Sequence, residues 1–126
     1  MKFNFATIHV KDLETSIRFY EEVIGMKMVR RFPAGPNMEI AFMAGAPEDE
    51  PGSAEIELIC QKGAEPAAYG EYPSLGLAVD DVDKALEHMK DKGVEITAGP
   101  VQPNPNTRFF FINDPDGVNL EIIEQK

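Results

Sequence analysis

Two glutamates are the residues of this chain whose types and positions are best suited to chemistry. Glu57 stands in Glu55-Ile56-Glu57-Leu58 and Glu121 in Asn119-Leu120-Glu121-Ile122, two stretches that alternate polar and apolar residues. Such alternation is typical of a β-strand with one buried face, so both carboxylates should lie on the face opposite the apolar side chains. A carboxylate in that position can abstract a proton next to a carbonyl, or it can bind a hard divalent cation.

The chain repeats one half-domain pattern, and the repeat makes the two glutamates equivalent. Val10-Lys11-Asp12-Leu13 and Val79-Asp80-Asp81-Val82 each open a helical stretch, and Asp12 and Asp81 are 69 positions apart. Asp is a favoured N-cap, and a glycine ends each helical stretch without strain, at Gly25 and Gly93. Symmetric halves would place Glu57 and Glu121 around a shared cleft.

Each half is predicted to contain a strand, a helix and three further strands, on either side of a connector at 61–73 that is rich in Gly and Pro. Asp114-Pro115-Asp116-Gly117 has the composition of a tight turn before the last strand. In the aromatic run Phe109-Phe110-Phe111, alternation should place one or two rings on the face of Glu121. The predicted helices are 12–25 and 81–93, and the predicted strands are 3–10, 26–32, 39–43, 53–60, 74–79, 94–97, 107–112 and 118–124.

Composition predicts a single globular domain over 1–126, with repeat halves at about 1–62 and 72–126. The 126 residues are 43% hydrophobic and 27% charged, with a net charge of −10 that disfavours nucleic acid and anionic membranes as partners. No apolar run approaches the ~20 residues of a membrane span, and the N-terminal residues lack the pattern of a signal peptide. A single cysteine, Cys60, fits a reducing compartment, so we expect a cytoplasmic protein.

These motifs together resemble the vicinal oxygen chelate superfamily, which includes glyoxalase I-like (lactoylglutathione lyase-like) and bleomycin-resistance-like proteins. The resemblance spans the chain and implies an α+β fold of two paired βαβββ modules, which form an open cupped mixed sheet with helices on the outer face. It also implies a homodimer that takes a small-molecule ligand. The matching residues are Ile8 to Leu13, Ser16, Phe19-Tyr20, Gly25, Ile56-Glu57-Leu58, Asp114 to Gly117 and Leu120-Glu121-Ile122.

In glyoxalase I-like members, two histidines and two acids hold a divalent metal. The resemblance carries the acids over to Glu57 and Glu121, whereas the histidine positions fall on Phe5 and Ser74. His9 lies roughly 13 Å along the strand from Phe5 and cannot replace that ligand. Metal binding by Glu57 and Glu121 is therefore expected to be weak or absent, and the cofactor is either a divalent cation (Mg, Mn, Ni or Zn) or none.

The substrate-binding candidates lie on the same strands as the glutamates. The resemblance places His9 at the mouth of the cleft, where it could contact substrate or could equally be a strand histidine satisfied within the fold, with Phe5 and Ser74 at the histidine ligand positions. Tyr72 shares the register of Ser74, and Arg108 could recognise an anionic ligand, or could equally be a surface charge that balances nearby acids.

Three functions are compatible with this pattern. The first is a glyoxalase I-like lyase or isomerase, lactoylglutathione lyase-like if active, in which Glu121 or Glu57 abstracts a proton next to a carbonyl and a bound cation stabilises the enediolate. The second is a metal-free small-molecule (drug) binding protein that resembles bleomycin-resistance proteins. The third is a thiol transferase, against which the missing histidines count most. We take the first as the prediction and the second as its alternative.

Overall fold

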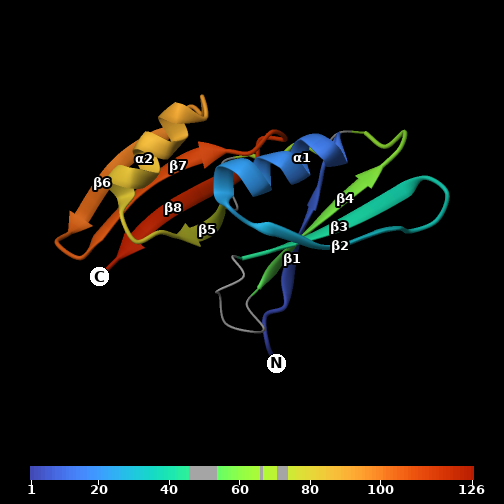
Figure 1. Cartoon of the computed structure of the whole chain (residues 1–126), viewed down its shortest axis with the longest axis horizontal. Helices are drawn as coiled ribbons and strands as arrows, with labels where there is room; N and C mark the ends of the chain where they lie inside the picture. The colour runs from blue at the N-terminus through green and yellow to red at the C-terminus, as the bar shows by residue number, and fades with distance from the viewer. Residues whose placement is uncertain (46–53, 66, 71–73) are drawn as a thin grey trace. The chain divides into compact units, whose positions relative to one another are not determined.

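The chain divides into two compact units, residues 1–67 (unit 1) and 68–126 (unit 2), and each is described by itself. The computed structural model describes residues 1–45, 54–65, 67–70 and 74–126 (Figure 1). The boundary between the units falls inside the connector that the sequence predicts at 61–73. None of the helices in the described part of the chain is long and apolar enough to cross a membrane.

Unit 1 is a four-stranded mixed sheet with one helical segment. The strand order is β1-β4-β3-β2, with β1 parallel to β4 and the other pairs antiparallel. Asp12 caps the helix, because its side chain accepts hydrogen bonds from the N–H groups of Glu14 (3.1 Å) and Thr15 (3.4 Å). The elements are β1 (Phe5–His9), α1 (Leu13–Phe19), the π-helix η1 (Tyr20–Ile24), β2 (Lys27–Pro33), β3 (Met38–Ala44) and β4 (Glu55–Gln61).

Unit 2 repeats this topology. Its strand order is β5-β8-β7-β6, again with one parallel pair at the first strand. Asp81 caps the helix by accepting a hydrogen bond from the Lys84 N–H at 3.1 Å. The elements are β5 (Ser74–Ala78), α2 (Val82–Asp91), β6 (Ala98–Asn104), β7 (Thr107–Asn113) and β8 (Asn119–Gln125). The predicted α+β fold of paired βαβββ modules is confirmed.

The last strand of each unit buries its apolar face. Ile56 and Leu58 of β4, like Leu120 and Ile122 of β8, are buried on the side of the sheet that carries the helix. Glu57 and Glu121 alternate with these residues and are half-buried on the opposite side. The hydrophobic core therefore fixes the direction in which each glutamate points, as the alternation predicts.

Two predicted elements differ from the structure. The stretch predicted as one helix becomes a π-helix after Phe19, and the N–H of Gly25, whose φ is 87°, bonds to the Tyr20 carbonyl. The strand predicted at 94–97 is wrong, because β6 begins at Ala98 and continues through Pro100 and Pro103. Strand β6 is an edge strand with an irregular register against β7, and proline is tolerated at such an edge.

Candidate functional site

Glu57 is the centre of a row of three residues across three neighbouring strands. In the strand register it lies opposite Thr7 of β1 on one side and opposite Phe42 of β3 on the other. The Thr7 hydroxyl donates a hydrogen bond to Glu57 Oε1 at 2.7 Å. This contact fixes the carboxylate against the sheet and occupies one of its oxygens.

Aromatic side chains surround Glu57 on this face. The Phe42 ring meets Phe5 edge-on, with centroids 5.4 Å apart at 90°, and stacks on Phe32 with centroids 6.2 Å apart at 23°. The Arg30 guanidinium lies 4.3 Å from the Phe42 centroid and pairs with Glu55 at 2.5 Å. Phe42 is only 7% exposed although it lies on the face away from the helix. Unit 1 therefore presents the Glu57 carboxylate, hydrogen-bonded by Thr7, on a face covered by the rings of Phe5, Phe32 and Phe42 (the aromatic floor).

Unit 2 carries the equivalent row with a different first member. Glu121 lies opposite Gly76 of β5 and opposite Phe111 of β7, whose ring meets Phe109 edge-on at 5.7 Å. A Cβ atom added at Gly76 would meet nothing within 4 Å, so the space beside the strand is open there. Within the described residues, Glu121 has no side-chain hydrogen bond or ion pair. The Glu121 carboxylate is therefore free of hydrogen bonds from the described side chains, whereas the Glu57 carboxylate accepts one from Thr7.

The next row on the same face of unit 2 is uncharged and polar. Ser74 lies opposite Asn119, and Asn119 lies opposite Asn113, two positions along each strand from the Gly76–Glu121–Phe111 row. A hollow of about 590 Å³ opens at this row. Its lining residues are Tyr69, Gly70, Ser74, Thr97, Ala98, Phe111, Asn113, Gly117 and Asn119.

The remaining predicted substrate-binding residues are distributed over both units. His9 lies on the same face of β1 as Thr7 and lines a second hollow, of about 800 Å³, with Cys60 and Gln61. Phe5 belongs to the aromatic floor around Phe42. Tyr72 lies outside the described residues.

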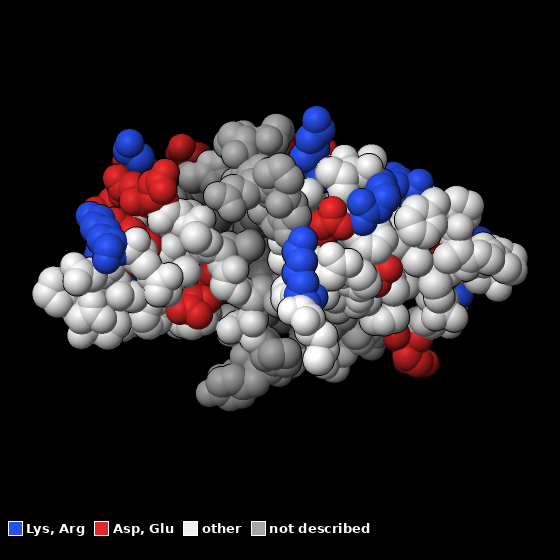
Figure 2. Space-filling model, turned by 90° about the horizontal axis from the view of Figure 1, so that it is seen from below, with Lys and Arg blue, Asp and Glu red and all other residues white. Residues whose placement is uncertain are grey.

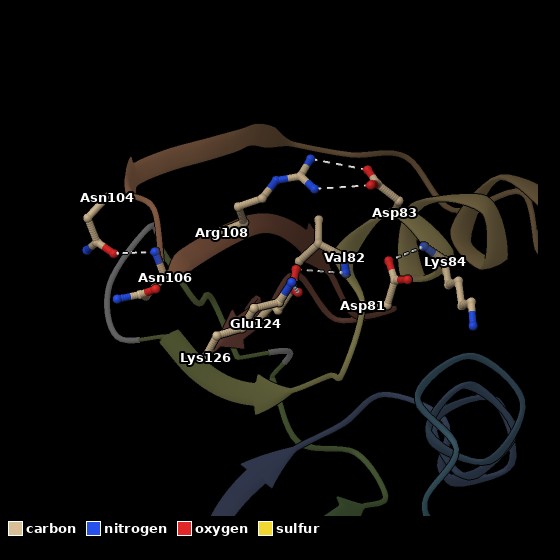
Figure 3. Close-up of polar contacts among 9 residues, drawn as sticks. All are labelled: Asp81, Val82, Asp83, Lys84, Asn104, Asn106, Arg108, Glu124 and Lys126. Atoms are coloured by element: carbon tan, nitrogen blue, oxygen red, sulfur yellow. Dashed lines mark hydrogen bonds and ion pairs between the residues drawn. The ribbon is translucent and has the colours of Figure 1, made fainter.

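Arg108 is not on the face of Glu121. It is two positions from the buried Phe110 and therefore shares the helix side of β7 with it, where it donates two 3.2 Å hydrogen bonds to the Asp83 carboxylate (Figure 3). The guanidinium lowers the pKa of Asp83, and Asp83 in turn raises the pKa of Arg108. This pair joins β7 to the first turn of α2, so the structure gives Arg108 a partner within the fold rather than a place beside Glu121.

The buried Glu124 also holds α2. Its carboxylate accepts a hydrogen bond from the Val82 N–H at 3.3 Å and pairs with Lys126 Nζ at 3.0 Å (Figure 3). A carboxylate at the first turn of a helix satisfies a free N–H and interacts favourably with the helix dipole. The acids in Figure 3 thus have structural partners at the first turn of α2.

Neither unit alone offers the ligands of a transition-metal site. Among residues 1–45, 54–65, 67–70 and 74–126, no group of three or more His, Cys, Asp or Glu side chains is placed to hold a metal ion. The neighbours of Glu57 are a hydroxyl and phenyl rings, and the neighbours of Glu121 are glycine and a phenyl ring. The donor set within each unit does not fit such a metal. That Glu57 and Glu121 line one common cleft stays a prediction.

Sequence reasoning missed the residues that flank the glutamates. Thr7 and Gly76, like Phe42 and Phe111, are 69 positions apart, the same spacing that relates Asp12 to Asp81. Glu57 and Glu121 themselves are 64 positions apart, so the 69-residue spacing relates the flanking residues of the two rows to each other but does not place them beside the glutamates. The expectation for the aromatic run is confirmed, since Phe110 is buried on the helix side and its two neighbours lie on the face of Glu121.

Comparison with known proteins gives a consistent result. Residues 2–122 match the model of the Glyoxalase/Bleomycin resistance protein/Dioxygenase superfamily. The lactoylglutathione lyase of Salmonella typhimurium is 37% identical over 131 residues, and that of Haemophilus influenzae is 33% identical over 129 residues. Each alignment covers 100% of this chain and 94% of the relative. The structure is similar to that of the trypanothione-dependent glyoxalase I of Leishmania major, with a TM-score of 0.82 and 26% identity, covering 98% of this chain and 86% of that one.

These similarities agree with the family that the repeated βαβββ topology and the two equivalent strand glutamates indicate. The chain belongs to the Glyoxalase/Bleomycin resistance protein/Dioxygenase superfamily, and it is glyoxalase I-like.

Proposed function

We propose that this chain is a glyoxalase I-like lyase or isomerase that moves a proton between adjacent carbons of a small carbonyl compound, with Glu121 as the base. The observation that carries this proposal is the pair of equivalent cross-strand rows. Glu57 accepts a hydrogen bond from the Thr7 hydroxyl, whereas Glu121 has the open space at Gly76 beside it. Relatives that are 33% and 37% identical over this whole chain are lactoylglutathione lyases, which supports the reaction class.

The proposed reaction is the isomerisation of a hemithioacetal. Glu121 takes the proton from the carbon that bears the sulfur and the hydroxyl, and the electron pair of that C–H bond forms the enediolate with the neighbouring carbonyl. The proton returns to the former carbonyl carbon, and the hydroxyl proton passes to that carbon's oxygen. The product is a 2-hydroxy thioester with the same atoms as the substrate.

Glu121 suits this role better than Glu57. Thr7 already occupies one oxygen of Glu57 with a hydrogen bond, so that oxygen is less available to take a proton from a substrate carbon. Gly76 leaves room beside Glu121 for the reacting carbon to approach. We assign Glu57 to substrate positioning.

No step of this reaction is assigned to a metal, because the described neighbours of Glu57 and Glu121 within each unit bring no imidazole or thiolate ligand. Glu57 and Glu121 are the only ligands that the resemblance would supply for a divalent cation. We propose that the ligand is a small molecule and that the working form is a homodimer, as is usual in the superfamily. Sedimentation equilibrium would test the dimer, and a monomer across the micromolar range would contradict it.

A coupled set of assays tests the proposed activity. The substrate is the methylglyoxal–glutathione hemithioacetal, and the absorbance of the thioester product is followed. The protein is purified without chelators and is assayed first as purified, then with EDTA, and then with added Ni²⁺, Zn²⁺, Mn²⁺ or Mg²⁺. We expect turnover that Glu121→Gln abolishes, because proton transfer by a positioned base contributes roughly 10²–10⁴-fold. Turnover that Glu121→Gln leaves unchanged would contradict the assignment.

The aromatic floor of unit 1 favours one other function, a metal-free binding protein. Phe5 and Phe32 are exposed rings on the face of the Glu57 carboxylate, which suits a cationic aromatic molecule, whereas Phe42 is buried with Arg30 over its ring. Isothermal titration with such a dye separates the two functions. Saturable binding that Glu57→Gln weakens, without turnover under any metal condition, would favour the binding protein.

A further inference from the structure

All the described residues that line the hollow of about 590 Å³ in unit 2 are uncharged. Ser74, Thr97, Asn113 and Asn119 bring hydroxyl and amide groups to it, and Phe111 adds an aromatic ring. Three of the polar residues form one cross-strand row, because Asn119 lies opposite both Ser74 and Asn113. These groups come from four separate segments of unit 2, so the fold assembles the hollow from residues distant in sequence.

The chemistry of this lining selects a class of ligand. Hydroxyl and amide groups both donate and accept hydrogen bonds, whereas they cannot neutralise a full charge. An anionic group would find no countercharge among these described residues and would lie one row from the Glu121 carboxylate, which is unfavourable. An uncharged group with donors and acceptors, next to a flat or apolar part that contacts Phe111, would fit on both counts.

The other large hollow differs in this respect. The hollow of about 800 Å³ in unit 1 has charged residues in its lining, among them Lys11, Lys62 and Glu65. Both acidic and basic side chains are visible among wide uncharged areas on the face seen in Figure 2. The neutral lining is therefore a local property of the unit 2 hollow and not of the chain as a whole.

The hollow is adjacent to the proposed base. Phe111 lines the hollow and is also the cross-strand neighbour of Glu121, and the Ser74 row is the next row on the same face. A ligand held in the hollow would extend along this face towards the open space at Gly76.

We propose that this hollow binds the uncharged hydroxyl, carbonyl or amide end of the substrate, so that the enzyme selects neutral substrates over anionic ones. This inference rests on the proposed function of Glu121. It predicts that the thiol carried by the substrate is a neutral one, in contrast to a charged peptide thiol.

The test compares hemithioacetals of methylglyoxal that differ only in the charge of a small thiol. The probes are 2-mercaptoethanol (neutral), mercaptoacetate (anionic) and cysteamine (cationic). We expect kcat/KM for the neutral adduct to exceed that for the anionic adduct at least tenfold. Asn113→Asp should reverse the preference towards the cationic adduct, whereas Asn104→Asp, the same charge change outside the hollow, should not.

A binding measurement separates failure of this inference from failure of the proposed function. The neutral adduct is titrated into the Glu121→Gln variant, and amide NMR shifts are followed at Ser74, Thr97 and Asn113. Saturable shifts at these residues would support the hollow, and if the original chain then shows no turnover of the same adduct, only the proposed role of Glu121 is overturned. Equal kcat/KM for the neutral and anionic adducts, or shifts confined to residues outside the hollow, would overturn the inference while the function stands.

Discussion

The two halves of this molecule share a scaffold and differ at the strand that lies beside each glutamate. In both, a glutamate on the last strand lies opposite a phenylalanine, at Phe42 and Phe111. In unit 1 its other neighbour is Thr7, which donates a hydrogen bond to it, and in unit 2 that neighbour is Gly76, which leaves space. A duplicated fold can thus keep one carboxylate in each half and give the two carboxylates different chemistry through a single neighbouring residue.

Among changes to the residues beside the glutamates, the largest effect is expected from copying the Thr7 arrangement into unit 2. Gly76→Thr would place a hydroxyl beside Glu121, where a Cβ meets no other atom within 4 Å. We expect kcat for hemithioacetal isomerisation to fall about tenfold or more, because a hydrogen-bonded carboxylate is a weaker base.

Gly76→Val is the matched control for this variant. Valine has the shape of threonine without its hydroxyl, so it separates the hydrogen bond from the loss of space. An equal fall in kcat for both variants would show that steric access to Glu121, and not hydrogen bonding to it, distinguishes the halves.

A smaller effect is expected from the reverse change in unit 1. Thr7→Val removes the 2.7 Å hydrogen bond to Glu57 and keeps the side-chain shape. We expect a rise in KM of a few-fold with kcat within about twofold, because Glu57 would be less well positioned while the base is unchanged. A fall in kcat larger than that caused by Gly76→Thr would indicate that Glu57 is the base.

The start of each helix is hydrogen-bonded to the last strand of its unit by a different side chain. We therefore expect substitutions of these two side chains to change the free energy of unfolding by different amounts. Glu124 of β8 bonds the Val82 N–H, whereas Cys60 on β4 donates its Sγ hydrogen to the Lys11 carbonyl at 3.6 Å. Glu124→Ala should lower the free energy of unfolding by about 1–3 kcal/mol, because a buried helix N–H loses its partner. Cys60→Ala should have a smaller effect in the same urea unfolding experiment, and the reverse order would contradict this comparison.

The smallest expected effect concerns pH. Arg108 lowers the pKa of Asp83 below the usual value of 3.8, and Arg31 does the same for Glu39 in unit 1. A carboxylate with a lowered pKa in the folded state contributes stability above its ordinary pKa and loses it as pH falls through the folded value.

Arg108→Met should therefore lower Tm slightly at pH 6, and the difference from the original chain should vanish at a pH below the pKa of folded Asp83. Both pairs are exposed, so the shift is small. Thermal unfolding from pH 2 to 7 measures it, and a Tm difference that is constant over this range would show that the ion pair does not contribute.

Much of the fold could be predicted from the sequence, because strong local signals and the hydrophobic pattern agree. Asp12 and Asp81 cap helices as expected, and the alternation in β4 and β8 gives the correct buried face. Strand β6 was misplaced because Pro100 and Pro103 disfavour a strand locally, and only edge pairing with β7 accommodates them.

The site was less predictable, because it depends on which residues meet across strands. Arg108 was a candidate ligand-binding residue on charge alone, although its position two residues from the buried Phe110 places it on the helix side. The Thr7–Glu57 bond depends on a parallel pairing between strands 50 residues apart, which no local signal in either strand specifies.

The most direct test of the central claim is substrate proton exchange in D₂O with the two glutamate variants. We predict that Glu57→Gln still exchanges the C–H proton of the hemithioacetal for deuterium, measured by ¹H NMR, whereas Glu121→Gln does not. Exchange that persists in Glu121→Gln and is lost in Glu57→Gln would contradict the claim that the open carboxylate of the second half is the base.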